Sequence, residues 1–86
     1  MCSPHDTSAL LRLRVVADAD PGAIARVLER FHNLNVIPRR VAAEFGIDGA
    51  MQMEVDVLGL SESQMEFIAA KVRQSISVTS AYWHPM

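Results

Sequence analysis

The sequence predicts an α+β fold in which four strands form one antiparallel sheet and two helices cover one of its faces. Some segments have apolar residues at every second position, which is typical of half-buried strands. Others have apolar residues spaced by three and four positions, which is typical of amphipathic helices. These segments follow one another in the order strand, helix, strand, strand, helix, strand. At 86 residues the chain is long enough for one small domain and too short for two.

The first strand is expected over residues 10–17, where apolar residues at odd positions alternate with Arg12 and Arg14. A helix is expected to follow directly, with Asp20 as its N-cap and Pro21 at its first position, where the amide that proline lacks is not needed. A turn at residues 33–35 then ends this helix, because asparagine tolerates the left-handed conformation. The apolar stripe of the helix consists of Ile24, Val27, Leu28 and Phe31.

The middle of the chain predicts a hairpin. Its first strand is expected over residues 36–45, and Pro38 places the start of this strand near a sheet edge. A glycine-containing turn at residues 46–49 leads into residues 51–57, which show the most regular alternation in the chain.

The last third of the chain predicts a helix and a strand. Ser61 is followed three residues later by Gln64, the spacing of a capping box, and the apolar stripe that begins there ends near Gln74. A short last strand is expected over residues 77–83. The complete order corresponds to a ferredoxin-like βαββαβ sandwich with one open sheet face.

Charged residues on the first and third strands are expected to meet on that open face. Arg12 and Arg14 lie opposite Glu54 and Asp56 in this topology, so cross-strand ion pairs explain the arginines better than an anion site does.

Composition excludes several classes of function. The net charge is −2 with acids and bases interspersed, so no basic surface is expected to bind nucleic acid. No apolar run approaches the roughly 20 residues that span a bilayer, so no membrane partner is expected. Cys2 is the single cysteine, which favours a cytoplasmic location. It lies in a polar segment, residues 1–8, expected to be a flexible leader before a domain at residues 9–84.

No residues are expected to be catalytic, and no cofactor or metal is expected. The three histidines are far apart in the sequence, and Cys2 has no histidine at a recognisable spacing. An acylphosphatase-like hydrolase on this sandwich would need an arginine and an asparagine in the first turn, where Asp18 and Asp20 stand instead. The chain is half hydrophobic, which is high for so small a domain, so a homodimer that buries apolar surface is expected.

The junction between the first strand and the first helix reads Asp-Ala-Asp-Pro-Gly and then Ala-Ile-Ala-Arg-Val-Leu, over residues 18–28. With the order of elements, this junction resembles that of ACT domains, which are small amino-acid-sensing modules. The likeness covers residues 10–83. It is strongest to the small regulatory subunit of acetolactate synthase, in the short form found with the valine-insensitive isozyme. The resemblance implies a non-catalytic subunit that activates a large catalytic subunit in branched-chain amino-acid biosynthesis; the alternative is a stand-alone ACT-type sensor acting on another protein.

The resemblance also implies a ligand site between the first turn of one chain and the start of the second strand of another. Backbone amides of Gly22 and Ala23 could bind a carboxylate, because a helix N-terminus favours anions. Ala19 and Ile37 stand where valine-responsive subunits usually carry asparagines. Without those polar groups a bound amino acid would lack partners, so a weak or absent valine response is expected. The candidate ligand-binding residues are Asp18, Ala19, Asp20, Gly22, Ala23 and Ile37.

Four residues are candidates for contact with the large subunit. Arg39 and Arg40 are adjacent and lie near the implied ligand edge, although a solvated strand end also explains them. Phe67 lies off the main stripe of the second helix and Trp83 lies near the end of the chain, so both are expected to be exposed in a monomer.

Overall fold

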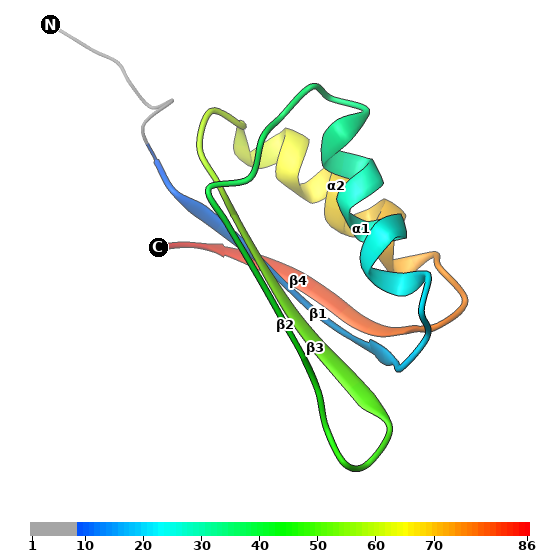
Figure 1. Cartoon of the computed structure of the whole chain (residues 1–86). Coiled ribbons are helices and arrows are strands. Elements are labelled where there is room, and N and C mark those ends of the chain that lie inside the picture. The colour runs from blue at the N-terminus through cyan, green and yellow to red at the C-terminus, as the bar shows by residue number, and fades with distance from the viewer. Residues whose placement is uncertain (1–8) are drawn as a thin grey trace, which may run out of the picture.

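A computed structural model of the chain describes residues 9–86 (Figure 1). The expected leader over residues 1–8, including Cys2, lies outside the described residues. The elements are β1 (Leu11–Asp18), α1 (Ala23–His32), β2 (Arg40–Phe45), β3 (Ala50–Val57), α2 (Glu62–Arg73) and β4 (Val78–Pro85).

The four strands form one antiparallel sheet in the order β2-β3-β1-β4, and both helices lie on the same face of it (Figure 1). This confirms the predicted ferredoxin-like sandwich. The central strands β1 and β3 pair along their full length, from Leu11 opposite Val57 to Asp18 opposite Ala50. Strands β2 and β4 are therefore the two edges of the sheet.

The hydrophobic core lies between the central strands and the helices. The buried residues follow the expected periods, every second position in β1 and β3 and every third or fourth position in the helices. The largest side chain with no exposed surface is Phe31 of α1. Other core residues are Leu11, Leu13, Val15, Met51, Met53, Val55, Met65, Ile68 and Val72. Neither helix of this part of the chain has the length and apolarity needed to cross a bilayer.

Helix α1 begins later than the sequence predicts. Gly22 is the residue before its first turn and makes no side-chain cap, so the expectation of Asp20 as N-cap and Pro21 as first helical residue is wrong. The Asp20 side chain instead accepts a hydrogen bond from the Gly22 amide at 3.0 Å, and the Asp20 carbonyl accepts one from Ala23 at 2.9 Å. A separate tight turn therefore comes between β1 and the helix.

Two other local predictions are confirmed. Ser61 and Gln64 form a complete capping box at the start of α2, with hydrogen bonds of 3.1 and 2.9 Å in the two directions. At the end of α1, Asn35 adopts a left-handed conformation with φ of 61°.

Strand β2 is shorter than predicted, because regular pairing starts at Arg40 rather than at residue 36. The β2–β3 hairpin projects past the helices (Figure 1). The face of β2 that points toward the helix side is consequently not covered, and Val41 and Phe45 remain 43% and 57% exposed.

Candidate functional site

The junction of β1 and α1 is the first candidate site, and its polar groups are already paired within the chain. The two amides expected to bind a carboxylate, those of Gly22 and Ala23, donate to the side chain and the carbonyl of Asp20. The Gly22 amide, followed by the guanidinium of Arg26, lowers the pKa of Asp20 below its ordinary value. The side chain and the carbonyl of Asp20 thus already use the two amides that a ligand carboxylate would need.

Arg26 closes the junction from the helix side, a role that the sequence did not reveal. Its guanidinium forms an ion pair with Asp20 and donates to the hydroxyl of Ser77 at 3.3 Å. The backbone adds two further ties, from the Asp18 amide to the Ser77 carbonyl at 2.8 Å and from the Ala19 amide to the Gly49 carbonyl at 3.0 Å. The turn after β1 is therefore held by segments that come much later in the chain.

The candidate ligand residues do not meet within one chain. Those at positions 18–23 lie at the start of α1, whereas Ile37 follows the end of that helix and is 87% exposed. A helix of ten residues is about 15 Å long, so it separates the two groups. Ala23 is buried in the core, whereas Asp18 and Ala19 are exposed. A site made of all these residues needs a second chain, as the family resemblance implies, and the site remains a prediction.

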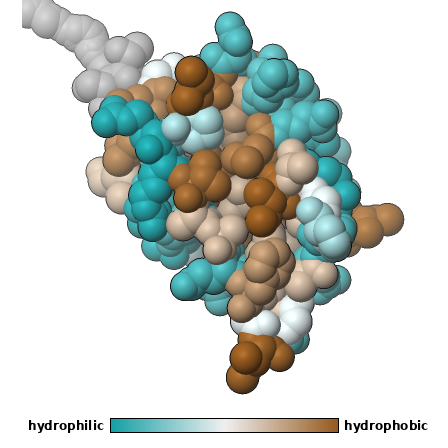
Figure 2. Space-filling model, in the orientation of Figure 1, coloured by the Kyte–Doolittle hydropathy of each residue, from teal (hydrophilic) through white to brown (hydrophobic). Residues whose placement is uncertain are grey.

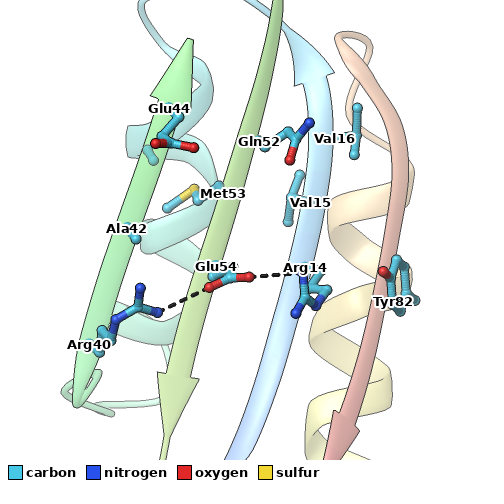
Figure 3. Close-up of a pocket in the computed structure, with 11 residues that line it drawn as sticks. Arg14, Val15, Val16, Arg40, Ala42, Glu44, Gln52, Met53, Glu54 and Tyr82 are labelled. Atoms are coloured by element: carbon cyan, nitrogen blue, oxygen red, sulfur yellow. Dashed lines mark hydrogen bonds and ion pairs between the residues drawn. The ribbon is translucent and has the colours of Figure 1, made fainter. Parts of the chain in front are cut away.

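The open face of the sheet carries a ladder of charges across three strands. Arg12 forms two hydrogen bonds with Asp56, at 2.7 and 2.9 Å, and Asp56 is almost fully buried. Glu54 accepts from Arg14 at 2.9 Å and from Arg40 at 3.1 Å, so one carboxylate joins β1 to β2 (Figure 3). The predicted cross-strand ion pairs are confirmed.

These pairs shift the acid strength of the carboxyl groups. The hydrogen bond from Arg12 outweighs burial and lowers the pKa of Asp56. The pKa of Glu54 is lowered in the same way, first by Arg40 and then by the charges of Arg12 and Arg14. Both groups stay ionised to a lower pH than free carboxyl groups do.

A hollow of about 290 Å³ lies on this open face, bordered by Arg14, Arg40, Gln52 and Tyr82 with Glu54 between the arginines (Figure 3). Its volume is close to the lower limit of ligand pockets, roughly 300 Å³. Both arginines that border it pair with Glu54, and Glu44, which also lines the hollow, balances the second positive charge. Within residues 9–86, no group of three histidine, cysteine or acidic side chains is arranged to hold a metal ion.

The four candidate partner contacts lie on two sides of the molecule. Arg39 and Arg40 are at the β2 edge, and both are exposed. Phe67 is on α2 and 57% exposed, with the ammonium of Lys71 at 5.3 Å from its ring centre. Trp83 is on β4 and only half-buried, so its expected exposure is partial.

A polar cluster that the sequence did not reveal joins α2 to the β4 edge. Glu66 accepts from the indole of Trp83 at 2.8 Å and from Arg73 at 3.1 Å. Arg73, followed by Trp83, lowers the pKa of Glu66. The Nε of Arg73 also donates to the carbonyl of Ala81 at 2.8 Å, so α2 is tied to β4 by side-chain and backbone contacts.

Comparison with known families agrees with this architecture. A family model described as an ACT-like domain matches residues 4–86. The chain belongs to the ACT-like domain family. ACT domains are typically regulatory domains that bind amino acids. Membership in this family indicates a regulatory domain, and it does not identify the enzyme that is regulated.

Solved structures of the same fold come from several kinds of protein. The C-terminal domain of MgtC from Mycobacterium tuberculosis is 16% identical with a TM-score of 0.75, covering 98% of this chain and 94% of that one. The ACT domain of GTP pyrophosphokinase from Chlorobium tepidum is 13% identical with a TM-score of 0.73, over 87% and 96% of the two chains. The regulatory subunit of aspartate kinase from Thermus flavus is 17% identical with a TM-score of 0.66, over 91% and 52%. At these identities the likeness extends to the fold alone, and a search by sequence found no match among curated proteins.

Proposed function

We propose that this ACT-like chain is a non-catalytic regulatory small subunit of acetolactate synthase, which activates the large thiamine-diphosphate-dependent subunit in the cytoplasm. The family match over residues 4–86 supports a regulatory role. The specific enzyme rests on the resemblance of the junction at residues 18–28 and of the order of elements to the short small subunits. The alternative is a stand-alone ACT-type amino-acid sensor that acts on another protein.

The pairing of Asp20 with its own amides and with Arg26 is the observation that favours a subunit with weak or no valine response. A ligand carboxylate at this place would have to displace the carboxylate of Asp20 and would then lie close to its negative charge. Ala19 and Ile37 add no polar group for the ligand ammonium, and an unpaired buried polar group costs roughly 1–3 kcal/mol. Valine binding would therefore be opposed by the loss of the Asp20 hydrogen bonds, by charge repulsion and by unpaired polar groups of the ligand.

A subunit can activate an enzyme without taking part in the reaction if it binds the two states of that enzyme with different affinities. A small chain that binds the active state of the large subunit more tightly than its inactive state shifts the population toward the active one. The exposed Phe67 of α2 is the contact we assign to the large subunit, together with Trp83 on the neighbouring strand. Apolar aromatic groups of this kind are common anchors in protein interfaces.

The test is the acetolactate synthase activity of the large subunit from the same organism, measured with and without the purified chain. We expect the chain to raise the activity, and added valine, leucine or isoleucine to change it little. Phe67→Ala should reduce the activation, whereas Glu29→Ala at an exposed position of α1 serves as a control that leaves it unchanged. A large subunit whose activity does not respond to the chain would contradict the proposal.

The sensor alternative has its own measurement. A ligand that binds only the folded state raises the melting temperature in a saturable way. We expect none of the twenty amino acids to do so strongly. A clear shift with one of them, reduced by Asp18→Ala, would favour the sensor over the acetolactate synthase subunit.

A further inference from the structure

The two faces of β2 differ in chemistry. The side chains of Val41, Ala43 and Phe45 lie on the helix side, and Figure 2 shows apolar surface on the projecting hairpin to which they belong. Arg40 and Glu44 lie on the open side of the sheet, where both line the hollow (Figure 3). The open side is therefore the face on which β2 offers groups to a charged ligand.

Four charged side chains line this hollow, and their charges sum to zero. Arg14 and Arg40 each pair with one oxygen of Glu54, so one positive charge is left over at this end. Glu44 makes no ion pair within residues 9–86, so the other end is negative. A ligand that carries one charge of each sign matches both ends, whereas an anion or a cation leaves one end unbalanced.

Polar atoms in the hollow are free to bind a ligand. Arg40 pairs through Nη1, with Glu54 at 3.1 Å and Asp56 at 3.7 Å, and its other N–H groups have no acceptor in the described part of the chain. The side-chain amide of Gln52, on the strand between Arg14 and Glu44, has no hydrogen bond to any of residues 9–86 either. A peptide bond has one donor and one acceptor, which an amide side chain can pair with.

The two charged ends are far apart. Glu44 lies opposite Gln52, which lies opposite Val16, two residues beyond Arg14. A spacing of about 4.8 Å between strands and a rise of about 3.4 Å per residue place the Cα atoms of Glu44 and Arg14 about 12 Å apart. Side chains stand roughly perpendicular to a sheet, so their charged groups are separated by a similar distance.

This separation selects the length of the ligand. An extended peptide spans about 3.5 Å per residue. An ion pair adds about 3 Å at each end. A dipeptide therefore reaches from one end of the hollow to the other, whereas a single amino acid is too short.

We propose that the hollow on the open face binds a dipeptide with free ends. The two arginines bind its carboxylate, Gln52 pairs with its peptide bond and Glu44 binds its ammonium. The site is separate from the candidate residues at positions 18–23, which lead into α1 on the other side of the sheet. It also does not depend on which enzyme the chain regulates, because its test uses the isolated chain.

The uncharged residues of the hollow indicate which side chains the dipeptide carries. Ala42 and Val16 are small and apolar, so they leave room for a peptide backbone above them. Tyr82 lies opposite Arg14 on β4, so its ring is next to the C-terminal residue of the ligand. An apolar C-terminal side chain can pack on this ring. The probe is therefore Ala-Leu.

The experiment is an NMR titration of the isotope-labelled chain with Ala-Leu. We expect saturable binding with a dissociation constant of about 1 mM or lower, the range of small ligands of this size. N-acetyl-Ala-Leu, Ala-Leu amide and free leucine should each bind about tenfold more weakly, because each lacks one charge or the required length. No saturation at ten times the expected constant, or leucine binding as tightly as Ala-Leu, would overturn the proposal.

Two variants test the assignment of the two ends. Glu44→Gln should weaken Ala-Leu about tenfold and should not weaken N-acetyl-Ala-Leu, which has no ammonium. Arg40→Gln should weaken Ala-Leu and should not weaken Ala-Leu amide, which has no carboxylate. Both residues are exposed, so the circular dichroism of the folded chain should be kept. Glu29→Gln, at an exposed position of α1 on the other side of the sheet, is the matched control and should change no affinity.

The same titration locates the ligand. We expect the backbone amide signals of Val16, Ala42 and Gln52 to shift. An equal loss of free and N-acetylated peptide in Glu44→Gln would overturn the assignment of the ammonium. Shifts confined to residues 18–23 would place the dipeptide at the β1–α1 junction and would overturn the site.

Discussion

The two edges of the sheet differ in how they are closed. At the β4 edge the Met86 amide donates to the Leu10 carbonyl, which fixes the phase of the β1–β4 ladder. Since inward and outward groups alternate along an antiparallel pair, the backbone groups of Ala81, Trp83 and Pro85 point away from β1. Arg73 donates to the Ala81 carbonyl, and Pro85 has no amide to offer. At the β2 edge, by contrast, the outward groups of the alternate residues Val41, Ala43 and Phe45 are exposed beside their apolar side chains. Proteins usually protect exposed edges, and among residues 9–86 the β4 edge has a side-chain donor and a proline that the β2 edge lacks.

The largest difference should appear between residues that face each other across the β2–β3 ladder. Met51 has no exposed surface, whereas its opposite residue Phe45 is largely exposed. Met51→Ala should lower the free energy of unfolding by about 3 kcal/mol at every protein concentration, because it leaves a cavity in the core. Phe45→Ala should lower it by less than about 1 kcal/mol, because an exposed side chain leaves no cavity when it is truncated. Urea titrations measure both, and an effect of Phe45→Ala as large as that of Met51→Ala would remove the distinction.

A smaller difference in the loss of stability is expected between the centre of the charge ladder and its β2 end. Asp56→Asn should lower the free energy of unfolding by about 2 kcal/mol, because the buried carboxylate accepts two hydrogen bonds from Arg12. Arg40→Ala, at a side chain that is 51% exposed, should have a much smaller effect. Equal losses of stability in thermal unfolding would show that the ion pair at the β2 end contributes as much as the pair at the centre.

The same ladder determines the response to acid. The folded-state pKa values of Asp56 and Glu54 lie below their ordinary values, so the unfolded chain binds more protons than the folded chain in acid. The stabilisation is present above about pH 4, the ordinary range of carboxyl groups, and is lost as the pH falls through the folded-state values. Asp56→Asn should make the free energy of unfolding less dependent on pH below about pH 4. An unchanged slope in Asp56→Asn would contradict this assignment.

The protection of the β4 edge should depend on Arg73. Arg73→Ala removes the donor to the Ala81 carbonyl and should lower the free energy of unfolding by about 1 kcal/mol. It should also let chains associate through the β4 edge, because the Ala81 carbonyl then has no side-chain donor. Glu29→Ala at an exposed position of α1 is the control. If light scattering gives the same mass for Arg73→Ala as for the parent chain, Arg73 does not prevent association at the β4 edge.

The smallest effect is expected at the end of the same strand. Pro85→Ala restores an outward amide at the edge, and we expect a change of only a few tenths of a kcal/mol in stability. Combined with Arg73→Ala it should increase the association beyond that of Arg73→Ala alone. Equal association of the single and double variants would show that the missing amide contributes nothing.

The sequence by itself determined the order of the elements, the buried faces of β1 and β3, the capping box of α2 and the ion pairs of the open face. Each depends on the spacing of neighbouring residues or on the pairing of two strands that the topology makes adjacent. The role of Asp20 at the junction after β1 could not be read from local spacing. Its side chain could have capped a helix beginning at Pro21, but it closes a separate turn and pairs with Arg26, which also binds Ser77.

Only the tertiary structure decided that Val41 and Phe45 are exposed. Their alternation is that of a strand with one apolar face, the same pattern that buries Met51 and Val55. A period of two records which face of a strand is apolar, but not what covers that face. Here the helices cover the central strands and stop short of β2, so an identical pattern yields core in one strand and open surface in its neighbour.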